Sequence, residues 1–131
     1  LGHSVLVPGS TAYPDSDGSV SGAIDSPAAS ANTNIVYRSQ AGEILHTQEL
    51  GAQSAGLVGF NWQDIPEEVL SQNASIKVEA YADTGKGLKS VGASVYSEVL
   101  AASTGTAASD VVYDVRGYGD VKASDVVRFK N

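Results

Sequence analysis

The sequence predicts an antiparallel all-β protein, and three observations lead to that fold class. Apolar and polar residues alternate over short runs, which is the pattern of strands buried on one face only. Gly, Ser, Asp and Pro separate these runs, as expected of the turns between such strands. Helical signal is confined to Glu67–Ser71, where Asp64 and Glu67 have the spacing of a helix cap. The runs amount to roughly nine to eleven strands, which is typical of β-sandwiches and small barrels.

In the N-terminal half, the apolar runs expected to form strands are Val5–Val7, Val20–Ile24, Ile35–Tyr37 and Ile44–Leu50. Pro8-Gly9 ends the first of them, and the turn-rich stretch Ser10–Gly18 follows. Gln40–Glu43 is predicted to be a hairpin turn, because Gly42 can adopt the positive φ that a tight turn needs.

The clearest strand pattern lies in Leu57–Trp62. Val58, Phe60 and Trp62 point to one face, and the residues between them point to the other. Two of the largest side chains in the chain therefore share a face, which we expect to be the centre of a core.

In the C-terminal half, strands are expected within Ile76–Tyr81, Leu88–Leu100, Val111–Val115 and Val121–Phe129. Gly92 is a candidate bulge or break in the second of these, which is long enough for one bent strand or two. The connections are predicted to be the turns Asp83–Gly87 and Arg116–Asp120 and the small-residue loop Ala101–Ser109.

Composition narrows the class of protein. The 131 residues suit one ordinary domain or two very small ones, and the lack of Cys excludes disulfides and Cys-based zinc sites. The net charge of −7 disfavours nucleic acid as a partner, because phosphates would be repelled. No apolar run approaches the roughly 18 residues that span a bilayer, so no membrane partner is expected. Because the chain also lacks Met, we expect a fragment or processed product whose N-terminal export region is missing.

Candidate metal sites fail on spacing. Asp15-Ser16-Asp17-Gly18 is similar to a calcium loop, but an EF-hand needs Gly at the sixth position and Glu at the twelfth. Here Gly18 is fourth and Ser26 is twelfth, so a turn is predicted. His3 and His46 each lack a second His three or four residues away. Glu49 and Glu79 could pair as carboxylates only if the fold placed them across a cleft.

Candidate catalytic and nucleotide-binding motifs fail in the same way. Val20 stands where a nucleophile elbow needs Ser, and Thr84–Gly87 lacks the flanking Gly and Ser or Thr of a phosphate loop. Lys122 stands where the dinucleotide fingerprint beginning at Gly117 needs Gly. We therefore predict no catalytic residue, no cofactor site and no metal site, and the chain is not expected to be an enzyme.

The order of several blocks indicates a family. These blocks are Gly2–Val5, Gly22–Ala29, Ile35–Tyr37, Gly42–Gly51, Gln53–Gly56, Phe60–Asp64, Val95-Tyr96, Gly117–Val121 and Asp125–Val127. Together they resemble the C-terminal region of the bacterial flagellar hook-capping protein, also called the basal-body rod modification protein. The resemblance covers nearly the whole chain. The family usually follows its Trp with a Gly-containing turn and a Leu-Pro-Asp-Gly-Thr-Tyr run, whereas Asp64–Ser75 stands here. A short helix is therefore expected in place of that hairpin.

The resemblance implies an architecture that periodicity alone does not give. A fibronectin type III-like, or immunoglobulin-like, sandwich at Ser19–Gly87 would be inserted into a small Tudor-like barrel. The barrel would be built from both ends of the chain, Leu1–Gly18 and Leu88–Asn131. At about 70 residues the sandwich would be shorter than the usual 100 or so.

The resemblance also implies a function. Its members are non-enzymatic scaffolds that cap the distal tip of the growing flagellar hook outside the cell and guide polymerisation of the hook subunit. Their expected partners are therefore the hook subunit protein and, in the full-length protein, further copies of the cap. Within this chain, the exposed sandwich face and the loops Gly51–Gly56 and Ala101–Ser109 are the expected contact surfaces, since loops on a rigid scaffold carry recognition.

Two other functions are open to an all-β chain of this kind. The main alternative is a carbohydrate-binding or adhesin module of a secreted bacterial protein, which would need clustered exposed aromatic rings, whereas the single Trp is expected in the core. A methyl-lysine reader would need converging rings, for which Tyr96, Tyr113, Tyr118 and Phe129 are available. Tyr96 and Tyr113 occupy alternating positions that are typical of a core.

Overall fold

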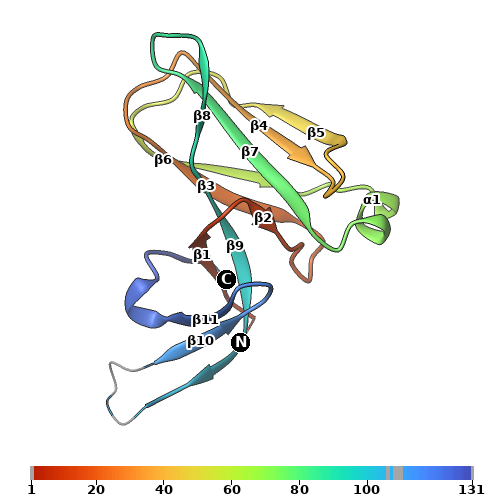
Figure 1. Cartoon of the computed structure of the whole chain (residues 1–131), viewed down its shortest axis with the longest axis vertical. Coiled ribbons are helices and arrows are strands. Elements are labelled where there is room, and N and C mark those ends of the chain that lie inside the picture. The colour runs from red at the N-terminus through yellow and green to blue at the C-terminus, as the bar shows by residue number, and fades with distance from the viewer. Residues whose placement is uncertain (1, 106, 108–110, 131) are drawn as a thin grey trace.

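The computed structural model describes residues 2–105, 107 and 111–130. Strands dominate it, which confirms the predicted all-β class (Figure 1). In chain order the elements are β1 (Ser4–Pro8), β2 (Thr11–Ala12), β3 (Val20–Ser26), β4 (Asn32–Arg38), β5 (Ile44–Glu49), β6 (Gly56–Trp62), α1 (Glu67–Gln72), β7 (Ile76–Asp83), β8 (Leu88–Val91), β9 (Ala93–Ser103), β10 (Val112–Val115), β11 (Gly119–Lys122), the 3₁₀ turn η2 (Ala123–Asp125) and β12 (Phe129–Lys130). No described helix is both long and apolar enough to cross a membrane.

The upper part of Figure 1 is a sandwich of two antiparallel sheets. One sheet has the order β2-β7-β4-β5, with β8 also paired to β7, and in the other β3 pairs with both β6 and β9. Along β4 and β7, buried positions alternate with more exposed ones, because one face of each strand contacts the opposite sheet. The predicted hairpin joins β4 to β5, and Gly42 in its turn has a φ of 94°.

The core of the sandwich is centred on β6, as its sequence pattern predicts. Val58, Phe60 and Trp62 are only 9%, 4% and 6% exposed. Trp62 contacts the fully buried Tyr37 of β4, with 4.9 Å between the ring centroids. Leu57, on the other face of β6, is 47% exposed. The alternation in sequence is thus an alternation between core and solvent.

Strands from the two ends of the chain form a second unit, which we call the terminal-strand sheet and which continues from β3 and β6 as part of one seven-stranded sheet. Its order is β11-β10-β9-β1-β12, so that β1 pairs with β9 on one side and with β12 on the other. Both termini lie in this lower unit in Figure 1. β2 and β8 pair with β7, although both fall outside the range 19–87 predicted for the sandwich.

The two units meet at Gly22, where a larger residue would not fit. β9 pairs with β3 only over Gly22–Ile24 before it continues into the terminal-strand sheet. A Cβ atom on Gly22 would lie 2.1 Å from the carbonyl oxygen of Ser94 and 2.5 Å from the Phe60 ring. Glycine at this position therefore allows β9 to cross closely over β3.

Two local predictions were wrong. The helix α1 begins after Pro66, and no side chain caps it, so Asp64 is not the cap. Pro66 is the N-cap residue, with φ −55° and ψ 141°, and the acidic Glu67 and Glu68 stand in the first turn, where they suit the positive end of the helix. The predicted loop at Ala101–Ser109 begins too early, because Ala101–Ser103 continue β9 by pairing with β10. Positions 106, 108 and 109 of that predicted loop lie outside the described residues.

Candidate functional site

The histidines have packing contacts. His46 stacks on Trp62, with 4.6 Å between ring centroids, and so covers one edge of the aromatic core. His3 lines a small apolar pocket beside Val99 and Phe129 in the terminal-strand sheet. Within the described ranges, no three His, Cys, Asp or Glu side chains are placed to hold a metal ion.

The segment Asp15–Gly18 forms a turn that is closed by its own hydrogen bonds. The amide of Gly18 donates to the carbonyl of Asp15 at 2.8 Å, and the amide of Asp15 donates to the carbonyl of Ser19 at 2.8 Å. The Ser19 hydroxyl and amide both donate to Asp17 Oδ1, at 2.7 and 3.0 Å. These bonds, the hydroxyl's first, lower the pKa of the Asp17 carboxyl.

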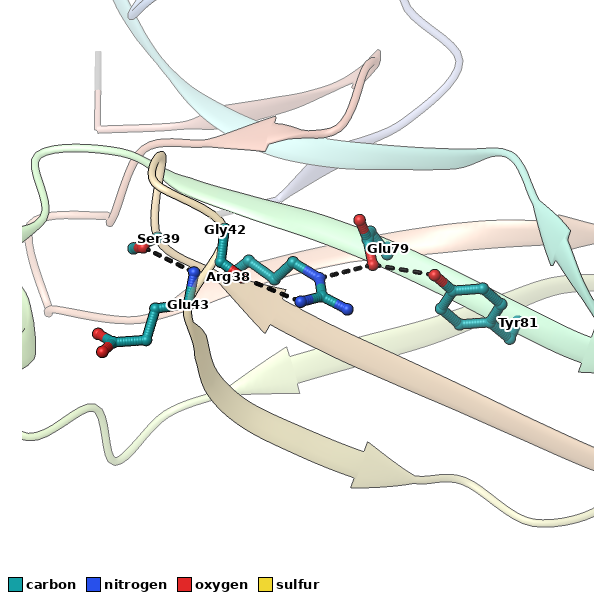
Figure 2. A network of polar contacts seen from close by, with 6 residues as sticks. All are labelled: Arg38, Ser39, Gly42, Glu43, Glu79 and Tyr81. Atoms are coloured by element: carbon teal, nitrogen blue, oxygen red, sulfur yellow. Dashed lines mark hydrogen bonds and ion pairs between the residues drawn. The ribbon is translucent and has the colours of Figure 1, made fainter.

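Glu49 and Glu79 are not brought together as a carboxylate pair. Glu49 is on β5 and Glu79 on β7, and β4 lies between these strands. Glu79 accepts hydrogen bonds from Arg38 Nε and the Tyr81 hydroxyl, each at 2.9 Å (Figure 2). The bond from Arg38 is the main cause of a lowered pKa for Glu79, which keeps this carboxylate ionised on the sheet surface.

The rings considered for a methyl-lysine cage form separate pairs. Tyr113 packs edge-on against Phe129, with centroids 5.9 Å apart, and Tyr118 packs in the same way against Tyr13 at 6.1 Å. Tyr96 faces Lys130 of its own chain, whose Nζ is 5.3 Å from the ring centroid. The arrangement does not match a cage for an incoming cation.

The single Trp is also unsuited to stacking on a sugar. Trp62 is 6% exposed and packs against both Tyr37 and His46, which also contact each other. A carbohydrate-binding module of the kind considered above would need such a ring at the surface. The structure therefore gives no support to the adhesin alternative.

A shallow groove lies on the outer face of β3 and β6. Small residues, Ala23 and Gly59, lie along its floor, and Leu57 of β6 and Tyr96 of β9 line its sides. Arg128, next to β12, adds a positive charge to a chain whose net charge is −7. The combination provides an exposed apolar side chain, an aromatic ring and a cation around a floor that a partner's backbone can approach closely.

Sequence reasoning did not find this groove. Its walls come from strands far apart in the chain, which are brought together by the pairing of β9 with β3, of β1 with β9 and of β12 with β1. The sequence feature that could have indicated the groove is the outward face of β6, where Gly59 stands between Leu57 and Asn61. The predicted contact loop Gly51–Gly56 lies at the start of β6 and is tied to Ser30 by an isolated bridge from Gln53.

Comparison with known proteins decides the family. A profile of the FlgD Ig-like domain matches residues 9–86, which is more than half of the chain. The chain belongs to the FlgD Ig-like domain family. The matched range ends just before β8, so it covers the strands of the sandwich from β2 to β7.

Solved FlgD structures share the fold of this FlgD Ig-like chain beyond the matched range. FlgD from Xanthomonas campestris superposes with a TM-score of 0.71 at 22% identity, covering 98% of this chain and 92% of that one. FlgD from P. aeruginosa gives 0.68 at 20% identity, covering 94% and 93%. A truncated FlgD from Helicobacter pylori gives 0.51 at 14%, covering 100% and 94%. No curated protein sequence matches the chain.

Proposed function

We propose that this chain is a non-enzymatic scaffold for flagellar hook assembly, which caps the growing hook tip and guides polymerisation of hook subunits. The observation that carries the proposal is the FlgD Ig-like match over residues 9–86. The full-length similarity of fold to FlgD of Xanthomonas campestris, described as a hook-capping protein essential for flagellar assembly, supports it. The chain would act outside the cell at the distal end of the hook, with the hook subunit as its partner.

The groove formed by Leu57, Gly59, Ala23, Tyr96 and Arg128 is the surface we assign to the hook subunit. A cap must release each subunit as the polymer grows, so its contacts should be small and weak. Affinities near micromolar or weaker are suitable for such an exchange. A shallow groove with one exposed leucine fits that requirement better than a deep apolar pocket does. The loop Gly51–Gly56, which leads into β6, would lie at the edge of the same contact.

The proposal is tested by deleting the gene for this protein and examining both the basal bodies and the culture medium. Bare rods with free hook subunit in the medium are expected, because subunits would be exported without being polymerised. Normal hooks on the deletion strain would refute the scaffold function.

The groove is tested separately by complementing the deletion strain with point variants. Leu57→Gln should reduce hook formation, because Leu57 is 47% exposed at the side of the groove. Leu88→Gln is the matched control: Leu88 is 50% exposed but lies on β8, in the other sheet. Equal hook counts in the two strains would place the contact elsewhere.

A further inference from the structure

The last strand of the chain reaches across the junction between the two units through a single side chain. Lys130 Nζ lies 3.3 Å from Asp15 Oδ2 and donates to Ser21 Oγ at 2.5 Å. It also lies over the Tyr96 ring. Lys130 belongs to the terminal-strand sheet, Ser21 to β3 of the sandwich, and Asp15 to the turn that precedes β3.

The same site is tied to the N-terminal strand. The hydroxyl of Ser4 on β1 donates to Asp15 Oδ1 at 3.3 Å, so both carboxylate oxygens of Asp15 have partners. Ser4 is also the residue opposite Lys130 in the pairing of β1 with β12. Asp15 therefore links β1, β12 and β3 at one point. On the far side of the junction, the Tyr118 hydroxyl donates to the carbonyl of Thr11.

The partly buried setting of this ion pair limits how much it can add to stability. The Asp15 side chain is 12% exposed, and burial raises the pKa of its carboxyl even though Lys130 opposes the shift. Asp17 and Glu98 are close enough to add to that rise. Removing two charges from water offsets much of what their attraction supplies, and such pairs can specify geometry instead.

We propose that Lys130 is a positioning residue that fixes the orientation of the sandwich relative to the terminal-strand sheet by binding Asp15 and Ser21 across the junction. This inference concerns the internal geometry of the chain and goes beyond the proposed function. Lys130 and Tyr96 also both line the groove, so a displacement of Lys130 would change its lining. Without the Lys130 contacts, β12 and the residues before it would be held by the pairing with β1, by the Leu6–Arg128 hydrogen bond and by the packing of Phe129 on Tyr113.

The test uses Lys130→Met, which removes the charge and keeps the long apolar stem. Lys89→Met is the matched control, because Lys89 is an exposed lysine on β8, away from the junction. The local readout is hydrogen exchange at the Leu6 amide, which donates to the Arg128 carbonyl at 3.1 Å and so reports on the docking of β12. Loss of the charged hydrogen bond should speed this exchange by about tenfold, with the Val99 amide unchanged.

The geometric readout is a set of residual dipolar couplings measured separately for the two units. In the wild type and in Lys89→Met, one alignment tensor should fit both units, whereas Lys130→Met should need two. Lys130→Arg should restore a single tensor, and Asp15→Asn in the Lys130→Met background should raise the unfolding midpoint by removing an uncompensated charge. A Lys130→Met variant with wild-type Leu6 exchange and a single tensor would overturn the proposal.

Discussion

Replacing Trp62 by Ala tests the core assignment most directly. The indole is 6% exposed and contacts two rings, Tyr37 at 4.9 Å and His46 at 4.6 Å between centroids. Truncating a buried Trp to Ala typically costs about 3–5 kcal/mol, from lost burial and from the cavity left behind. His46 is only half-buried and can settle into part of that cavity, so we expect about 3–4 kcal/mol.

Urea unfolding followed by far-ultraviolet circular dichroism measures this loss without depending on the deleted fluorophore. With a slope of about 2 kcal/mol per molar urea, the midpoint should fall by about 2 M. A domain with about 5–15 kcal/mol of stability would remain folded in buffer after such a loss, so the curve can be measured.

Leu57→Ala is the control for this experiment, because it lies five residues earlier on the same strand and faces solvent, 47% exposed. Surface changes usually alter stability by about 0.5 kcal/mol or less, which is about 0.3 M here. If Trp62→Ala moved the midpoint no further than Leu57→Ala, the inner face of β6 would not be the core.

Further predictions concern the junction, the sheet surface and the division of the chain. Gly22→Ala should lower the free energy of unfolding by about 1–3 kcal/mol, because the added Cβ would lie 2.1 Å from the Ser94 carbonyl oxygen. An unchanged urea midpoint would contradict the close crossing of β9 over β3. The pKa of Glu79 is lowered from 4.5, so its stabilising contribution is complete above that pH and lost as pH falls through the folded-state value. Thermal midpoints of wild type and Glu79→Gln should differ at neutral pH and converge in acid; a constant difference would refute this. Limited proteolysis should cut within the exposed turn 84–87, leaving the buried Ser19 intact; early cleavage at Ser19 would argue against this packing.

Local rules predicted the parts of this fold that depend on neighbours in sequence. A period of two along β6 was enough to place Phe60 and Trp62 in the core and Leu57 outside it, because side chains of a strand alternate between its faces. Gly42 marked a turn for a similar reason, since the positive φ there is a local requirement.

The candidate site depends on contacts between strands far apart in the chain, which patterns among sequence neighbours cannot predict. Lys130 and Ser21 are separated by 109 positions in the chain, and nothing in the residues around either one indicates the other. The end of β9 was misjudged for a related reason. Ala101–Ser103 have the small side chains of a loop, but their backbone pairs with β10 and so continues the strand. In both cases a distant partner decided the outcome.

The edge strands of the sandwich, β5 and β6, are partly closed to strand addition by a side chain. β5 and β6 each pair with a single strand among those described, and unpaired edges of this kind invite addition of a foreign strand. Gln48 of β5 closes part of this opening, because its amide nitrogen donates to the Asn61 carbonyl of β6 at 2.9 Å. Its amide oxygen accepts from the Tyr37 hydroxyl at 2.7 Å, and burial raises the pKa of Tyr37, which keeps that donor protonated. With an edge carbonyl occupied in this way, addition of a foreign strand to β6 is less favourable, which agrees with the small-residue groove that we propose as the contact surface.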